Sequence, residues 1–446
     1  MTSPLAAIPV APGRLPGIGH GLAMRRDPLA FLSSLAQYGP LVRIYLGPRP
    51  VVVAATPDLA RHVLVTDAKS FHKGRLFDKI RPVMGNGLMT SNGRFHRQQR
   101  RLIQPAFHRE RVAGYIDVMS SLARDLADTF EDGQTVDVRA ELNDTMITIL
   151  GRTLFATELG SAATRQAQAS MPVLQDTIAR RTMSPIPFLE KLPTPANRRF
   201  EQATAQMRGI LDRVIDEYRQ EGVDRGDLLS LLIAARDENG EAMPAEQIRD
   251  ELVTIFAAGM DTTSDTVAWA LYEFGQHPDL QERAYEEVHR AVGAEAVTAT
   301  DVPQMLFLQH AVKEVLRVHP PANLLMRKAI TDVELDGIRL PAGTEVMTSP
   351  LLFHHDPALY PDPDRFDPDR WGRPETTAMP RTAYLPFGAG ARQCIGDVFT
   401  TTQAVVVMAT LLARWRLEPA PGHVVQPIHG VTVSPGKVLM TLHARS

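Results

Sequence analysis

The amino-acid sequence predicts a mainly α-helical fold with a smaller β portion. Apolar residues recur at helical spacing through most of 57–320 and again in 399–415. Short β-type runs punctuated by Gly and Pro occur toward both ends, at 41–56 and 332–440. No linker-like stretch separates these regions, so we expect a single domain over 1–446.

The elements follow in order along the chain. Two β-rich runs, Leu41–Leu46 and Val51–Ala55, flank a Gly-Pro-Arg-Pro turn and predict a hairpin. Amphipathic helices follow, and a long one is expected from Pro244 to Gln276. After about Asp332 short strands alternate with turns, and a last helix precedes the C-terminal strands.

The composition narrows the functional class. Of the 446 residues, 44% are hydrophobic and 22% are charged, and the net charge is −3, which is ordinary for a globular protein and indicates neither a nucleic acid nor an anionic membrane as partner. The single cysteine excludes disulfides and favours a cytoplasmic location. Apolar runs stay short of the roughly 20 residues that span a bilayer, so we expect no membrane anchor.

That cysteine, Cys394, ends a glycine-rich segment, Phe387-Gly388-Ala389-Gly390-Ala391-Arg392-Gln393-Cys394-Ile395-Gly396. Three glycines in ten residues disfavour a regular helix or strand and allow a tight loop close to a large flat ligand. An apolar helix follows, and its first N–H groups would favour a thiolate. A buried cysteine in a structural turn is the simpler alternative for such a loop.

The spacing Phe-x-x-Gly-x-Arg-x-Cys-x-Gly resembles the haem-binding signature of the cytochrome P450 family. The resemblance implies the cytochrome P450 fold and haem b, with the Cys394 thiolate as axial iron ligand. It also implies haem contacts from Phe387 and Gly396 and a bond from Arg392 to a haem propionate.

The expected long helix carries a second stretch that is similar to the family, Ala258-Gly259-Met260-Asp261-Thr262-Thr263. Gly and paired Thr are poor mid-helix residues, which indicates a local distortion beside a ligand. The resemblance places Ala258 against the haem. It implies that Thr262 hydrogen-bonds to dioxygen or an ordered water and that Asp261 relays protons.

Further matches concern charged residues. Glu314 and Arg317 share a helix face, and the family implies that they form a buried structural network with Arg365 of Pro363-Asp364-Arg365-Phe366. His96 and Arg100 also share a helix face, and together with Arg327 they match residues that contact haem propionates.

The resemblance implies a monooxygenase that inserts one oxygen atom from O2 into a C–H or C=C bond of a lipophilic small molecule. Ferredoxin and ferredoxin reductase would supply electrons. We hypothesise that some of the arginines expected near the haem face the acidic ferredoxin: Arg97, Arg100, Arg101, Arg109 and Arg111. In the overall character of its sequence, the chain resembles bacterial members that oxidise terpenes. The residues expected to line the substrate pocket are apolar: Phe77, Leu88, Met89, Leu174, Phe256, Leu324 and Leu325.

Other functions stay open at this point. A peroxide-driven hydroxylase or a rearrangement or coupling enzyme would share the fold, although the Asp261-Thr262 pair favours O2 activation. A haem sensor or carrier would have no use for that pair. Fatty acids, steroids and macrolides remain alternative substrates.

Overall fold

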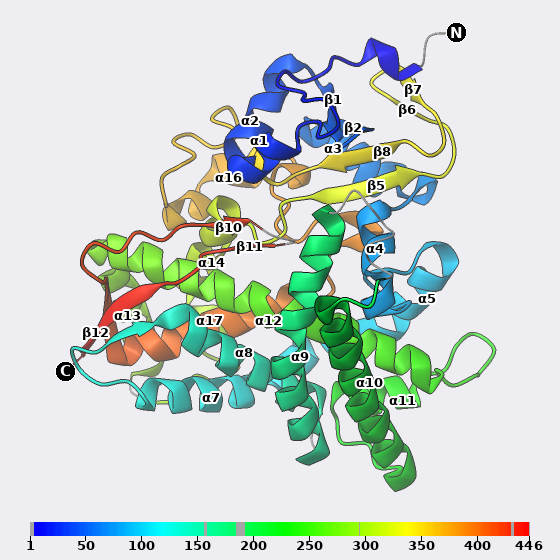
Figure 1. Cartoon of the computed structure of the whole chain (residues 1–446). Helices are drawn as coiled ribbons and strands as arrows, with labels where there is room; N and C mark the ends of the chain where they lie inside the picture. Colours follow the sequence, from blue (N-terminus) through cyan, green and yellow to red (C-terminus); the bar gives the residue numbers. More distant parts are fainter. Residues whose placement is uncertain (1–3, 156–157, 184–191, 294, 430–431, 446) are drawn as a thin grey trace.

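The computed structural model describes residues 4–155, 158–183, 192–293, 295–429 and 432–445. Helices make up most of it, and the larger β-sheet lies along one side, in the upper part of Figure 1. This confirms the expected mainly α-helical fold with a smaller β portion. The expected helical segments at 156–157, 184–191 and 294 lie outside the described residues.

The α-helices of the described residues are α1 (Gly21–Arg26), α2 (Pro28–Ser33), α3 (Pro57–Arg61), α4 (Arg75–Met84), α5 (Gly93–Ile103), α6 (Arg109–Ala113), α7 (Ile116–Asp128), α8 (Val138–Leu154), α9 (Glu158–Met183), α10 (Pro195–Glu221), α11 (Leu228–Ala234), α12 (Ala245–Gln276), α13 (Pro278–Val292), α14 (Leu306–Val318), α15 (Leu351–His354), α16 (Pro374–Ala378) and α17 (Asp397–Arg414). The strands are β1 (Leu41–Leu46), β2 (Arg49–Ala54), β3 (Phe71–Lys73), β4 (Thr135–Asp137), β5 (Leu325–Ala329), β6 (Val333–Leu335), β7 (Ile338–Leu340), β8 (Glu345–Thr348), β9 (Trp415–Pro419), β10 (Ile428–His429), β11 (Val433–Ser434) and β12 (Leu439–Ala444).

The larger sheet joins strands from distant parts of the sequence, in the order β1-β2-β8-β5-β3. The predicted hairpin β1–β2 is antiparallel, and β2 runs parallel to β8 with Val52 opposite Val346. At the far edge β3 pairs with β5, which places Lys73 directly opposite Arg327. The sheet therefore brings two cationic side chains from opposite ends of the helical region to one place.

Some short strands escaped the sequence analysis. Strands β3 and β4 lie inside the expected helical region, and β5 precedes the expected C-terminal β-rich region. A strand of three residues is too short to show the alternation of apolar and polar residues by which strands are recognised. The last helix also begins earlier than expected, at Asp397, and ends before Trp415, which starts β9.

Helix α12 is the central element of the larger apolar cluster. It contacts α8, α10, α14 and α17, and most of its 32 residues are half-buried or buried. A second apolar cluster fills the space around the larger sheet. A helix buried on nearly all sides can hold chemical groups at fixed positions because packing immobilises it. Among the described residues, no helix is both long and apolar enough for a transmembrane span.

Candidate active site

The Cys394 segment forms an irregular loop that leads into α17. Gly388 and Gly390 both have positive φ, +67° and +69°, which L-residues rarely adopt. A Cβ on Gly390 would lie 2.1 Å from the carbonyl oxygen of Leu64, so this position requires glycine. The loop is closed by a hydrogen bond from the Cys394 amide to the Phe387 carbonyl, at 2.8 Å. The expected tight loop is confirmed, and it holds the thiol just before the α17 N-terminus.

Cys394 is exposed and forms part of the wall of a cavity of about 690 Å³, although protein surrounds most of its thiol. This surrounding protein desolvates the sulfur and raises the pKa of the thiol. The Gly396 amide, Arg100 and Lys73 act in the opposite direction, because each stabilises a thiolate. An accessible sulfur beside cations and a backbone donor is suited to binding a metal ion as a thiolate.

Cationic side chains gather beside this loop. Lys73 and Arg327 face each other across β3 and β5, and Arg392 acts on both electrostatically. Arg327 is 6% exposed, and desolvation lowers its pKa to about 10. Desolvation, followed by Arg327 and Arg392, lowers the pKa of Lys73 well below its usual value. Buried cations that repel one another require an anionic partner.

His96 and Arg100 approach the same region from α5. His96 is buried, and desolvation and four surrounding cations lower its pKa to about 3, so the imidazole is neutral. It can therefore donate one hydrogen bond. The Arg100 guanidinium donates to the Gln393 carbonyl at 2.6 Å, which connects α5 to the Cys394 loop. The sequence analysis found His96 and Arg100 by their spacing but missed Lys73, because an isolated Lys in a three-residue strand carries no pattern.

These residues fit the haem that the sequence motif implies. A haem offers an iron atom for one thiolate and two propionates for cationic or neutral donors. The described residues provide one accessible thiol, and beside it donors that are buried or half-buried: Lys73, His96, Arg100, Arg327 and Arg392. The strongest electrostatic neighbours of Lys73 are two guanidiniums and the Cys394 sulfur. The chemistry of this donor set matches a dianionic porphyrin with thiolate ligation.

The Ala258–Thr262 stretch lies in the middle of α12, which continues unbroken through it. Ala258 is exposed although most of its neighbours along the helix are half-buried or buried, so an open space adjoins this face. The Thr262 hydroxyl donates to the Ala258 carbonyl at 2.8 Å. Asp261 is half-buried. One turn later Asp265 is buried against Arg139, at 2.7 Å, and desolvation raises its pKa to about 7.

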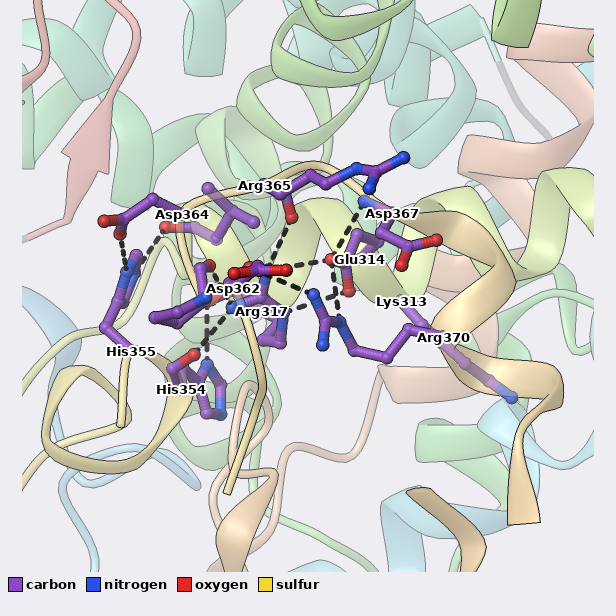
Figure 2. Close-up of polar contacts among 12 residues, drawn as sticks. Lys313, Glu314, Arg317, His354, His355, Asp362, Asp364, Arg365, Asp367 and Arg370 are labelled. Atoms are coloured by element: carbon purple, nitrogen blue, oxygen red, sulfur yellow. Dashed lines mark hydrogen bonds and ion pairs between the residues drawn. The ribbon is translucent and has the colours of Figure 1, made fainter. Parts of the chain in front are cut away.

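A buried ionic network joins α14 to the segments around His354 and Arg370 (Figure 2). Glu314 and Arg317 are both fully buried on α14, with two hydrogen bonds between them, at 2.8 and 3.0 Å. Arg317 also donates to the backbone carbonyls of His354 and Pro363, at 2.7 and 2.6 Å. Every charge in this pair is hydrogen-bonded, which is the condition under which a buried ion pair is tolerated.

The second arginine of this network is Arg370, and the prediction of Arg365 was wrong. Arg370 is 3% exposed and donates to Glu314 at 3.3 Å, and Trp371 donates to the same carboxylate at 3.0 Å. The Arg365 side chain is exposed, and its backbone carbonyl accepts a bond from Arg317 at 3.2 Å. The error arose because Pro363-Asp364-Arg365-Phe366 is followed five residues later by Pro368-Asp369-Arg370-Trp371, with the same Pro-Asp-Arg-aromatic pattern.

His354 connects the network to the cysteine loop. Its Nδ1 lies 3.0 Å from the Arg317 carbonyl, and its Nε2 accepts a hydrogen bond from the Leu385 amide at 2.9 Å. This pair of bonds requires the neutral ring, and desolvation lowers the pKa of His354 to about 3. Leu385 precedes Phe387, whose carbonyl holds the Cys394 amide. Sequence spacing cannot show such a link, because His354 and Leu385 are 31 residues apart.

The residues expected to line the substrate pocket divide into two groups. The half-buried ones have surface available to a ligand: Phe77, Leu88, Met89, Leu324 and Leu325. The other two, Leu174 and Phe256, are 1% and 0% exposed, so their prediction as lining residues was wrong for this structure. Phe256 packs against the ring of Phe155 at 5.8 Å. Both belong to the packed core, from which apolar character alone cannot distinguish a pocket wall.

Comparisons with known proteins agree with this site. The family model for cytochrome P450 matches residues 9–441. Cyclooctat-9-en-7-ol 5-monooxygenase of Streptomyces melanosporofaciens is 40% identical, over 92% of this chain and 90% of that protein. Cyclooctatin synthase of the same organism is also 40% identical, over 97% of this chain and 94% of its own. Pentalenene oxygenase of Streptomyces avermitilis is 36% identical, over 98% and 97%.

A comparison of folds also indicates the cytochrome P450 family. The crystal structure of the cytochrome P450DA haem domain superposes with a TM-score of 0.87 at 27% identity, covering 98% of each chain. The family match spans both the cysteine loop and the α12 stretch. The chain therefore belongs to the cytochrome P450 family and is a monooxygenase.

Proposed function

We propose that this enzyme holds haem b through the Cys394 thiolate and oxidises a terpene with electrons from a ferredoxin. The observation that carries the proposal is the accessible thiol beside buried cations, for which the part of the chain that the structure describes provides no balancing anion. When bound, haem b with a thiolate ligand supplies the activation of O2 needed to insert one oxygen atom into a C–H or C=C bond. A single cysteine stays reduced in the cytoplasm, where we place the protein.

On the thiolate side, the loop and its supports position the sulfur. The Gly396 amide hydrogen-bonds to the Cys394 sulfur, and Phe387 anchors the Cys394 amide. Lys73, Arg327 and His96 would hold the propionates. Glu314, Arg317 and Arg370 keep α14 attached to the segment that leads into this loop. These residues are one rigid support for a sulfur that must stay aligned with the iron.

On the side of the site formed by α12, residues of this helix would relay protons. The Thr262 hydroxyl donates a hydrogen bond to the Ala258 carbonyl, so its oxygen lone pairs remain available to accept one. The half-buried Asp261 carboxylate would take up protons from solvent and deliver them to the group held by this hydroxyl. The apolar surroundings on α12 would exclude other water from the reaction.

The substrate class rests on two supports. The half-buried apolar residues near the site, including Phe77, Leu88 and Leu325, suit a hydrocarbon bound by shape. The relatives named above are called oxygenases of pentalenene and of cyclooctat-9-en-7-ol. A spectral titration of the spin-state shift with these two compounds, palmitate and a steroid tests this. Tight binding of a fatty acid or steroid alone would overturn the terpene assignment.

Electron delivery is proposed on the face that carries the 690 Å³ cavity, since Cys394 opens onto it together with Arg109. A second cavity of about 370 Å³ is lined by Arg97 and Arg100. Arg101 instead forms an ion pair with Glu238 at 2.6 Å, and Arg111 donates to the Gly226 carbonyl at 3.3 Å. We therefore assign the acidic ferredoxin to Arg97 and Arg109, which are exposed and line these cavities. Arg101 is also exposed and lines the smaller cavity, but it is already paired with Glu238.

The deciding experiment is the spectrum of the reduced protein with carbon monoxide. We expect the strongly red-shifted Soret band of thiolate ligation, lost in Cys394→Ser. Consumption of O2 and NADPH with ferredoxin and its reductase, compared with turnover on H2O2, then separates a monooxygenase from a peroxide-driven enzyme. The red-shifted Soret band of thiolate ligation without any substrate-dependent O2 uptake would support the haem site but refute the proposed activity.

A further inference from the structure

Two buried carboxylates at the start of α12, to which the proposed function gives no role, hold the loop that carries Leu88. The loop comprises residues 85–91 and is called the Gly85 loop here. Asp250 accepts a hydrogen bond from the Asn86 amide at 2.7 Å, and Glu251 accepts one from the Leu88 amide at 2.7 Å. Gln247 completes the contact by donating to Glu251 at 2.7 Å and to the Asn86 carbonyl at 3.3 Å. Three residues within little more than one turn of α12 therefore hold the backbone of one loop.

The Gly85 loop lies so close to α12 that only glycine fits at two positions. A Cβ on Gly87 would lie 2.2 Å from the Thr254 hydroxyl and 2.6 Å from the Asp250 carbonyl. A Cβ on Gly85, which has φ +57°, would lie 2.0 Å from the Asp250 carboxylate. Because these glycines have no Cβ, the loop backbone can lie against the helix, where the carboxylates reach its amides.

This contact is expensive in free energy. Asp250 and Glu251 are 8% and 0% exposed, and desolvation raises the pKa of Glu251 to about 7. Apolar residues of similar size would pack here without that cost. Buried carboxylates aimed at particular amides fix a loop in one position more strictly than apolar packing does.

The held loop lies on the catalytic face of α12. Glu251 and Ala258 are seven residues apart, so they point in nearly the same direction, about 10 Å apart along the helix. Leu88 and the following Met89 are half-buried and pack at the edge of the larger core. At the other end of the loop, the Ser91 carbonyl and the Asn92 side chain accept hydrogen bonds from Arg392 at 2.7 and 2.9 Å. The loop therefore spans from α12 to the cysteine loop.

We propose that Asp250 and Glu251 are positioning residues that set the substrate-facing wall at Leu88 and Met89, and so determine how tightly a substrate binds and which carbon is oxidised. They act through the loop backbone without touching the substrate. This inference rests on the proposed oxidation of a lipophilic substrate, but it concerns the shape of the site and makes its own predictions.

The experiment compares Glu251→Ala with Glu251→Gln in the haem-loaded enzyme. The Gln side chain keeps an oxygen that accepts the Leu88 amide, whereas Ala leaves that amide buried without a partner. With cyclooctat-9-en-7-ol or pentalenene as probe, whichever gives a spin-state shift with the wild type, we expect Glu251→Ala to weaken binding about tenfold and to broaden the ratio of oxidation products. Glu251→Gln should restore both to within about threefold of the wild type.

Two control variants distinguish displacement of the Gly85 loop from general effects of substitution. Glu246→Gln removes an exposed carboxylate from the same helix and should change neither binding nor product ratio. Gly87→Ala displaces the loop without altering either carboxylate and should reproduce the Glu251→Ala product ratio, whereas Gly209→Ala, in open space on α10, should not. If Glu251→Ala yields no loaded protein, Gly87→Ala carries the test.

The outcomes separate this inference from the proposed function. Absence of the thiolate Soret band in the wild type would defeat the proposed function. The inference alone would be overturned if all variants kept the thiolate Soret band and both Glu251→Ala and Gly87→Ala bound the substrate probe and formed its products as the wild type does.

Discussion

Replacing Arg370 by Met tests the assignment of the buried network, because the exposed Arg365 offers a control five residues away. Arg370 donates to Glu314 at 3.3 Å and to the carbonyls of Pro361 and Asp362 at 2.7 and 3.2 Å. Removing one partner of a buried ionic network costs roughly 3–5 kcal/mol. Glu314 keeps its bonds from Arg317, so we expect the lower end, about 3 kcal/mol.

This cost changes the unfolding equilibrium roughly a hundredfold. Urea titrations of the haem-loaded protein, followed by far-ultraviolet circular dichroism and by the Soret band, measure it. Arg365→Met should stay within about 0.5 kcal/mol of the wild type, as surface substitutions do. Equal destabilisation by the two variants would refute the reasoning, since it would mean that the two Pro-Asp-Arg segments contribute alike.

Further predictions follow from the same contacts. His354 is neutral in the folded protein, with a pKa of about 3, so acidification below about 6.5 favours the unfolded chain, which binds the extra proton. Protonation of His354 in the unfolded chain should lower the free energy of unfolding by about 2 kcal/mol from pH 7 to pH 5. His354→Gln should lose this contribution, so its urea midpoint should depend less on pH. Lys73→Met should stabilise the haem-free chain, where the ammonium is buried opposite Arg327, yet speed haem loss to apomyoglobin; a slower loss would contradict its proposed role. Thr262→Ala should lower product formed per NADPH while leaving substrate affinity unchanged, as measured by peroxide release and spectral titration. Arg109→Glu should weaken the salt dependence of ferredoxin-driven reduction, whereas Arg111→Glu, whose arginine is already bonded to Gly226, should affect it less.

The sequence identified those parts of the site that depend on residues close together in the chain. The Cys394 loop, the Ala258–Thr262 stretch and the Glu314–Arg317 pair each lie within one loop or helix, where spacing determines which side chains meet. Helical periodicity likewise predicted the long helices. Local pattern and local structure coincide in all these cases.

Contacts between distant segments could not be predicted in this way. Lys73 meets Arg327 only because β3 pairs with β5, and His354 meets Leu385 through packing of two loops. Arg365 and Arg370 have the same local pattern, and only the tertiary fold buries one of them. Phe256 is as apolar as a pocket residue, but its packing partner Phe155 is 101 positions earlier in the numbering. The hydrophobic driving force has no direction, so it cannot specify which apolar side chains face a ligand.

The pairing of β3 with β5 has a consequence for biosynthesis. The N-terminal strands emerge from the ribosome early, but their partners β5 and β8 follow only after more than half of the chain. At about 5–20 residues per second, the ribosome reaches β5 roughly 13–50 s after Lys73, and it adds Cys394 later still. During that interval the β3 edge has no partner strand, and exposed strand edges are prone to aggregate. We expect chaperone capture of nascent chains to peak before β5 is translated, and the cofactor to enter only after translation is nearly complete.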